Sequence, residues 1–316
     1  MRLFPATAIL AATTLPALAA PPQVVVDMPV TGSLVSMVMG DLGAPHVLLP
    51  GGADAHDYQL RPSDAAALQG AGLLVWIGPQ MTPWLDRAAE QVARGDSLVL
   101  LEVEGTHLQD FGAGAAHDHA HDHDGDHGHD HDADHADDHG HDHSGLDPHA
   151  WLDPFNAQVW LRAIAGSLSA ADPDNAAAYA ANADDAAKRI AALDGRIAAQ
   201  LQPFHDASFA VMHDAYGYFT GHYGLRPAIA VSLGDAASPS AAQIASVRAT
   251  IAGQGATCIF PEPLTDPRMA ALIAEGTDLR ARGVMDPEGA GLEPGPGLYP
   301  AVLTGLADAL AACLGG

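Results

Sequence analysis

A tract of 27 residues near the middle of the chain, 117–143, contains only His, Asp, Gly and Ala. Eleven of its residues are His and ten are Asp. Such a segment has no large apolar side chains to bury, so burial cannot offset the conformational entropy lost on ordering. We therefore expect a disordered loop, spanning about 113–145, that interrupts the folded unit in which it lies.

The chemistry of this tract indicates metal binding. Imidazole and carboxylate are ligand types that suit zinc and similar divalent ions, and His-rich tracts are a compositional sign of metal binding. A purification tag would be terminal and would not alternate with Asp, whereas an acidic loop that only solvates the protein remains an alternative. The imidazoles expected to capture metal are His117, His119, His121, His123, His127, His129, His131, His135, His139, His141 and His143.

Composition limits the possible partners. The formal net charge is −26, of which the tract contributes ten negative charges, so the remainder of the chain carries about −16 (−26 + 10). A protein this acidic is poorly suited to nucleic acid or anionic membranes and well suited to cationic ligands. Its 316 residues, 48% of them hydrophobic, favour two globular units with sizeable cores.

Residues 1–20 have the pattern of a secretory signal peptide. Arg2 supplies the positive start, an apolar stretch follows, and Ala17-Leu18-Ala19 fits a cleavage site. A membrane anchor is the alternative, but the stretch is short and contains Pro5 and Pro16. No Cys lies near the cleavage point to carry a lipid. We expect a soluble protein exported to a bacterial periplasm.

The two cysteines, Cys258 and Cys313, are expected to pair. In an oxidising compartment two cysteines usually form a disulfide, which here would join a strand-like segment to the C-terminal helix. A two-thiol metal site is the competing interpretation, and it would need further ligands nearby.

Apolar runs alternate with helical patterns along most of the chain, which is typical of α/β lobes with parallel sheets. In the first lobe, strands are expected at 24–26, 46–50, 73–77 and 97–101, and helices within 34–43, from Pro62 onward and at 83–94. In the second lobe, strands are expected at 208–212, 229–233, 258–260 and 283–285, and helices at 214–223, 241–253, 267–279 and 298–314.

One long Ala-rich helix is expected between the lobes. Asp172 can cap it, Pro173 suits its first position, and Pro203 ends it. Two helices broken at Gly195 are the alternative. The predicted fold is therefore α/β, with an N-terminal lobe over 21–172, a linking helix over 173–203 and a C-terminal lobe over 204–316.

Three histidines outside the tract lie where strands should give way to loops or helices. These are His56, His149 and His213, the first two in the first lobe and the third in the second. Ligands in open α/β sheets bind at such strand ends. Asp286 follows another expected strand, and three imidazoles with one carboxylate would complete a tetrahedral zinc shell in the cleft between the lobes.

Several segments together resemble the zinc-binding receptors of bacterial ABC transporters, the ZnuA-type branch of the metal-receptor family. They are GGADAHDYQLRPSD, DPHAWLDP, VMHDAYGYF, ATCIFPEP and MDPEG, in the same order and over nearly the whole mature chain. The resemblance implies two lobes joined by one rigid helix, with Zn²⁺ bound between them by His56, His149 and His213. It also implies a monomeric periplasmic receptor, with no organic substrate and no enzymatic activity, that delivers zinc to a membrane permease.

The resemblance leaves the fourth ligand open. Some zinc receptors of the family use a Glu immediately before the first His, where this chain has Ala55. Related receptors use an Asp that maps onto Asp286, and water is the other option. The Cys258–Cys313 pair resembles a disulfide of zinc members. Manganese receptors carry a carboxylate at the position of His213, so three imidazoles favour zinc.

Two other functions compete with that of a receptor. A storage or buffering protein would use the tract as its main site and bind many ions weakly. A zinc hydrolase would use an open position on a three-His site, but the chain has no HExxH or GxSxG motif. In a receptor, the tract could raise the local zinc concentration and pass ions to the cleft.

The remaining polar and aromatic residues near the motifs are expected to have structural roles. Glu262 follows a buried strand and could lie near the cleft, but a capping or surface role is favoured. Four aromatic residues are expected to pack as core around the site: Trp151, Tyr216, Tyr218 and Phe219. Four histidines without a motif are expected to be structural or solvated: His46, His107, His205 and His222.

Overall fold

Two parallel sheets with the same strand order organise the protein. The computed structural model describes residues 21–112, 145–232 and 239–316, so the expected signal peptide and the His/Asp tract lie outside the described residues. The first sheet has the order β2-β1-β3-β4 and the second the order β6-β5-β7-β8. Their strands are β1 Val24–Val26, β2 His46–Val47, β3 Leu73–Trp76, β4 Asp96–Val99, β5 Phe209–His213, β6 Ile229–Ser232, β7 Cys258–Phe260 and β8 Arg280–Ala281.

The central strands are apolar because both of their faces are covered. β1, β3, β5 and β7 are buried along their whole length, as parallel strands between helical layers should be. Val25 pairs with His46 on one side and with Leu74 on the other. In the second sheet, Ala210 pairs with Ile229 and with Ile259. These registers confirm the predicted α/β class with two parallel sheets.

Helices cover both sheets, and many of them begin at a proline, which has the backbone angle of a first helical position. They are α1 Pro29–Met39, α2 Pro62–Gly70, α3 Pro83–Gln91, α4 Pro154–Ala171, α5 Ala176–Leu201, α6 Gly217–His222, α7 Ala241–Gln254, α8 Pro267–Ala274 and α9 Leu298–Leu314. Short 3-10 helices include η3 Ala150–Leu152 and η4 Pro173–Asn175.

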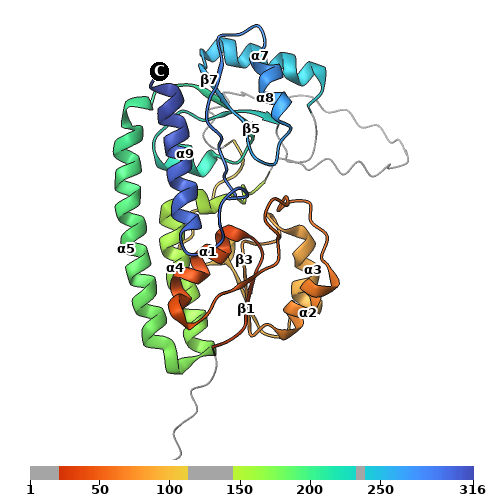
Figure 1. The fold of residues 1–316 in the computed structure, drawn as a ribbon, viewed down its shortest axis with the longest axis vertical. Coiled ribbons are helices and arrows are strands. Elements are labelled where there is room, and N and C mark those ends of the chain that lie inside the picture. Colours follow the sequence, from red (N-terminus) through yellow and green to blue (C-terminus); the bar gives the residue numbers. More distant parts are fainter. Residues whose placement is uncertain (1–20, 113–144, 233–238) are drawn as a thin grey trace, which may run out of the picture.

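The expected long helix is α5, which runs through Gly195 without a break. Its 26 residues span about 39 Å at 1.5 Å per residue. It starts later than predicted, because Asp172 and Pro173 belong to the end of α4 and to η4. Figure 1 shows α5 along one side of the molecule beside both lobes.

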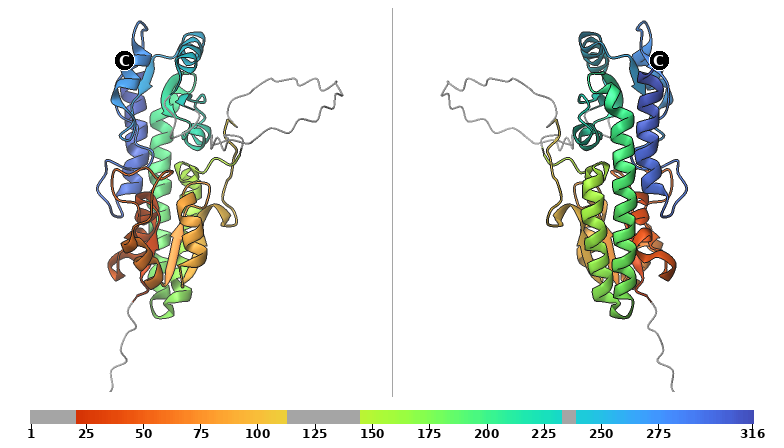
Figure 2. Two further views of the ribbon diagram at one scale, coloured as in Figure 1. Left: turned by 90° about the vertical axis from the view of Figure 1, so that its right-hand side faces the viewer. Right: turned by 90° about the vertical axis from the view of Figure 1, so that its left-hand side faces the viewer.

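Two further helices pack along α5. α4, which the sequence analysis did not predict, leads into α5 and packs along its first half, while α9 packs along the second half; Figure 2 shows the three together from two sides. α1 of the first lobe contacts both α5 and α9. Leu34, Ile190 and Leu306, from α1, α5 and α9, belong to one continuous apolar core that also reaches both sheets.

Among the boundaries in the second lobe, those of β8 and α8 differ most from the prediction. The strand expected at 283–285 is replaced by β8 at Arg280–Ala281, because Gly283 has a positive φ of 79° and turns the chain. α8 ends at Ala274 rather than 279, because Glu275 is extended and Gly276 has a positive φ of 74°. Among the described residues, no helix is both long and apolar enough to cross a membrane.

Cys258 and Cys313 form a disulfide, which confirms the predicted pairing. The bond joins β7 to α9, and both cysteines are fully buried. It therefore attaches the second sheet to the helix that also packs against α1 of the first lobe.

Removing this disulfide should lower the free energy of unfolding. Closing a loop of 55 residues contributes about 4 kcal/mol in the chain-entropy model. We expect a Cys258→Ala/Cys313→Ala variant to lose up to that amount in urea denaturation followed by circular dichroism. The oxidised wild type is the reference. An unchanged midpoint would contradict the expected contribution.

Candidate metal centre

The three predicted histidines meet between the lobes. His213 is the last residue of β5, His56 lies in the loop after β2, and His149 directly precedes η3. The ring centroids are 5.5 Å apart for His56 and His149 and 5.6 Å apart for His149 and His213. Two imidazoles on one tetrahedral zinc ion would have centroids roughly 5 Å apart. The rings are thus close to the spacing that a shared ion requires.

The site is slightly more open than a closed metal shell. Within residues 21–112, 145–232 and 239–316, no three His, Cys, Asp or Glu side chains already converge closely enough to hold an ion. The centroid distances exceed the tetrahedral value by only some tenths of an ångström. The spacing of the rings is therefore compatible with one shared ion.

His149 is held by a carboxylate. Its Nδ1 lies 2.8 Å from Asp147 Oδ1, and its backbone N–H donates to the same oxygen at 3.0 Å. A carboxylate accepts hydrogen bonds, so Nδ1 carries the proton and Nε2 carries the lone pair. Nε2 is buried and has no hydrogen-bonding partner among the described residues. A buried nitrogen of this kind calls for a ligand.

His213 is held in the same way by Glu262. Its Nδ1 lies 2.5 Å from Glu262 Oε2, and the other carboxylate oxygen accepts from Tyr216 Oη at 2.8 Å and from Met212 N at 3.3 Å. The prediction that Glu262 caps or lies at the surface is wrong, because this residue is only 6% exposed. β5 and β7 are neighbours in the sheet, so the residues that follow them meet at its edge.

His56 lies in a less regular segment. Its backbone N–H donates to Asp54 Oδ1 at 2.8 Å, and the neighbouring Ala55 O accepts from Trp84 Nε1 at 2.7 Å. Ala55 is fully buried. The loop is thus attached to α3 through Trp84, while the His56 side chain itself is half-buried.

Asp286 lies on the wall of the cavity that His56 and His213 also line. Its two oxygens accept from Ala290 N at 2.9 Å and from Gly291 N at 2.8 Å. The carboxylate therefore holds its own loop in place, and each oxygen still has a lone pair for another partner. Ligation by Asp286 stays a prediction.

The cavity is strongly acidic. Five carboxylates line it, and no Lys or Arg is among its described lining residues. They are Asp54, Glu262, Asp266, Asp286 and Glu288. Burial, together with the nearby charge of Glu262, raises the pKa of Tyr216 well above its usual value. Such a field favours a cation and disfavours an anion.

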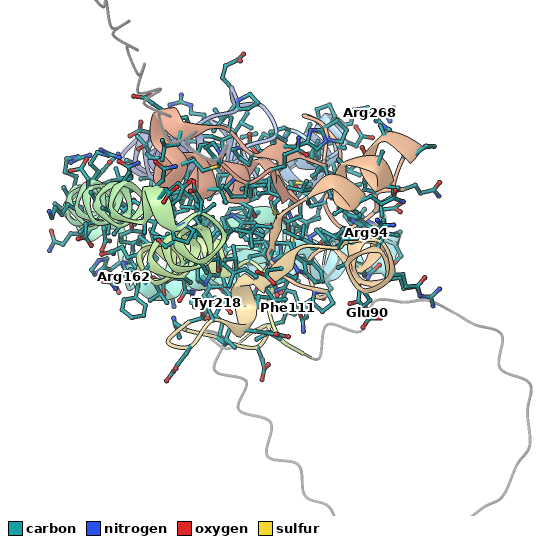
Figure 3. The ribbon with its side chains drawn as sticks, turned by 90° about the horizontal axis from the view of Figure 1, so that it is seen from below. Glu90, Arg94, Phe111, Arg162, Tyr218 and Arg268 are labelled. Atoms are coloured by element: carbon teal, nitrogen blue, oxygen red, sulfur yellow. A yellow bond between two sulfur atoms is a disulfide. The ribbon has the colours of Figure 1, made fainter. Side chains whose placement is uncertain are left out.

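Aromatic side chains form the predicted buried surroundings. Trp151, Tyr216, Tyr218 and Phe219 are each no more than 1% exposed, which confirms their expected place in the core. Tyr218 Oη accepts from Gln109 N and donates to Asp147 O, both at 3.0 Å, so it supports the residue that holds His149. Phe111 packs edge-on against His149, and Figure 3 shows Phe111 and Tyr218 at the same edge of the molecule.

The other histidines do not join this site. His107 and His222 pair with Asp153, and His222 also pairs with Asp194, in agreement with a structural role. His46 is exposed on β2. The eleven histidines of the tract lie outside the described residues, so their part in metal capture stays a prediction.

Fold and site together define a class of protein: a two-lobed α/β binding protein whose ligand cavity lies between the lobes. The family model described as "Zinc-uptake complex component A periplasmic" matches residues 24–313. The chain belongs to this family, ZnuA. Membership confirms the resemblance noted in the sequence and the expected periplasmic location.

Related proteins agree with this assignment. The "High-affinity zinc uptake system protein ZnuA" of Paracoccus denitrificans is 55% identical over 315 residues, covering 98% of this chain and 96% of the relative. The protein of the same name from Brucella abortus is 40% identical over 306 residues, covering 92% and 91% of the two chains.

Solved structures share the fold. "Crystal structure of ZnuA" superposes with a TM-score of 0.73 at 22% identity and covers 92% of this chain and 98% of that one. The Mn-bound periplasmic metal binding protein from Candidatus Liberibacter asiaticus gives a TM-score of 0.72 at 18% identity, with coverages of 92% and 99%. At these identities the likeness establishes the two-lobed architecture alone.

Proposed function

We propose that this protein captures Zn²⁺ in the cleft between its lobes and delivers it to the membrane permease of an ABC transporter. The observation that carries the proposal is the close approach of three imidazoles: His149 and His213 are held by carboxylates, and His56 and His213 line one cavity. Metal-bound histidines are usually held in this way by an outer carboxylate or carbonyl. Family membership and the names of the relatives support the same function.

His56, His149 and His213 are the proposed ligands, with Asp286 or a water molecule in the fourth position. Three imidazoles suit zinc better than manganese, which prefers oxygen-rich sites. Copper(II) binds such ligands more tightly than zinc does, so selectivity rests on tetrahedral geometry and on the metals available.

Delivery requires the permease to reach an ion held between two lobes that share one apolar core. Such a core resists wide hinge opening, so release is expected to rely on small tilts and loop movements. The loop of His56 is the least regular of the three segments that carry ligands.

A zinc titration tests the receptor function directly. We expect residues 21–316 without the tract 117–143 to bind one Zn²⁺ tightly, measured by calorimetry with a competing chelator. His56→Ala and His213→Ala should weaken binding by more than the roughly 10–100-fold that outer-shell substitutions cost. His46→Ala, on the exposed β2, is the matched control and should bind like the parent.

The same titration separates a receptor from a storage protein. Weak binding of many ions by the intact chain, with no binding after deletion of 117–143, would assign metal binding to the tract. In that case the three cleft histidines would not form the site, and buffering would be the better interpretation.

Zinc affinity should also depend on pH. An imidazole must be neutral to bind a metal, so protons compete with the ion below the free imidazole pKa of about 6.5. We expect the dissociation constant to rise steadily from pH 7 to pH 5, measured with a chelator of known pH dependence. A constant affinity from pH 7.5 to 5 would contradict a site built mainly from histidine.

A further inference from the structure

Glu262 makes contacts that a surface or capping residue would not make. The residue follows β7, is only 6% exposed, and its carboxylate contacts Met212 and His213 of β5. One oxygen, Oε2, faces His213 Nδ1, and the other, Oε1, accepts from Tyr216 Oη and Met212 N. A carboxylate in its ordinary ionised form can accept from all three partners at once.

These contacts determine where the imidazole proton lies. A neutral imidazole carries one proton, and a nitrogen that carries it has no lone pair for a metal. We propose that Glu262 and Asp147 are positioning residues that keep the protons of His213 and His149 on Nδ1, so that each Nε2 presents its lone pair to the ion. This inference rests on the proposed function, because it assigns roles around the same site.

The two positioning residues should differ in their tolerance of an amide. In Glu262→Gln, the amide oxygen should face Met212, because the backbone N–H of Met212 can only donate. The amide nitrogen of the new Gln then faces Nδ1 of His213. That nitrogen donates, so Nδ1 of His213 must accept and its proton moves to Nε2, where it blocks the metal.

In Asp147→Asn, the oxygen that faces His149 can stay in place. The amide nitrogen then faces Gln109, whose Nε2 now donates to Asp147 Oδ2 at 3.2 Å. Gln109 can rotate its own amide and accept instead. The proton of His149 therefore remains on Nδ1, and this variant should be milder than Glu262→Gln.

Imidazole tautomers can be observed in the zinc-free protein. Long-range ¹H–¹⁵N NMR should show His213 protonated on Nδ1 in the wild type and on Nε2 in Glu262→Gln, with His213→Ala used to assign the signals. Zinc affinity should fall about 10–100-fold in Glu262→Gln and less in Asp147→Asn. Glu275→Gln, which removes an exposed carboxylate of the same lobe, is the charge-matched control.

The outcomes separate this inference from the proposed function. If His213→Ala loses zinc while Glu262→Gln keeps both the wild-type tautomer and the wild-type affinity, the positioning role is wrong and the receptor function stands. If His213→Ala also binds normally, the proposed site itself is wrong. A variant that loses affinity without a change of tautomer would point to general destabilisation and would also overturn the inference.

A second and independent observation concerns His222 at the end of α6. Its Nδ1 lies 2.9 Å from Asp153 Oδ1, and its Nε2 lies 2.9 Å from Asp194 Oδ1. Both partners are carboxylates, so both ring nitrogens donate and the ring is a cation. Asp153 caps α4, Asp194 lies on α5, and His222 belongs to the second lobe.

Other titratable groups surround His222. His107 Nδ1 binds the second oxygen of Asp153 at 2.8 Å, Tyr223 packs edge-on against the His222 ring, and Tyr299 of α9 lies near the same charges. Burial raises the pKa of Tyr223 and of Tyr299, as does the nearby negative charge, so both remain neutral. We infer that protonated His222 is a pH-sensitive clamp that holds the second lobe to α4 and α5.

The sign of the pH effect follows from the pKa of His222. Burial alone would lower it, but the hydrogen bonds and charges of Asp153 and Asp194 outweigh burial and raise it above 6.5. The stabilisation is therefore complete below about 6.5, the free imidazole value, and is lost as the pH rises through the raised value. Burial alone would raise the pKa of Asp153, but its hydrogen bonds with His222 and His107 outweigh burial and lower it, so its contribution is lost only as the pH falls through that lowered value.

Urea denaturation of His222→Gln against the wild type tests the clamp. We expect the wild-type midpoint to exceed that of the variant at pH 6, and the difference to shrink at pH 9. Hydrogen exchange of α6 should be faster in the variant at pH 6 but similar in the two proteins at pH 9. His46→Gln is the exposed control. A difference that does not change with pH would overturn the inference.

Discussion

The apolar packing among α1, α4, α5 and α9 is the constraint on which the rest of the molecule depends. α5 runs beside both lobes, α9 runs beside the second lobe, and their buried faces belong to a single core that includes residues of each lobe. The disulfide adds a covalent connection between this layer and β7. With the lobes held at a nearly constant separation, residues on opposite sides of the cleft can meet at distances suited to one small ion.

The site itself depends on sheet topology. In the order β6-β5-β7-β8, β6 is added on one side of β5, and β7 and β8 are added on the other. The strand order therefore switches between β5 and β7, and ligands of open parallel sheets bind at such a switch point. His213 ends one of these strands and Glu262 follows the other. Across the cleft, His149 lies in a segment that Asp147 fixes from within and that Trp151 anchors to the other lobe by donating to Pro287 O at 2.8 Å.

Much of this architecture could be predicted from local patterns. β1, β7 and α9 match their predicted limits, because apolar runs and an uninterrupted helical pattern mark them clearly. The three histidines were identified by their position after expected strands and by the family resemblance. α4 was not predicted, although Asp153 caps it and Pro154 begins it, because both residues also close the segment DPHAWLDP that carries the metal motif.

The carboxylates that hold the histidines could not be predicted from the sequence, for a different reason. Glu262 and His213 are 49 residues apart in the sequence. They come into contact only because β7 pairs with β5 in the sheet. Such a pairing depends on the whole sheet and leaves no local pattern. The Pro-Glu-Pro segment after a buried strand was the one available signal, and propensity alone favoured the surface for its Glu.

The two sheets share one strand order, yet the two lobes do not form independent folding units. Each lobe has a sheet of the same topology and a small apolar cluster of its own. The larger core, however, is common to both lobes and is closed by helices from the first and last parts of the described chain. If the chain were divided at the cleft, each half would expose an apolar face to water. The two lobes therefore repeat one topology, but the protein folds as a single unit.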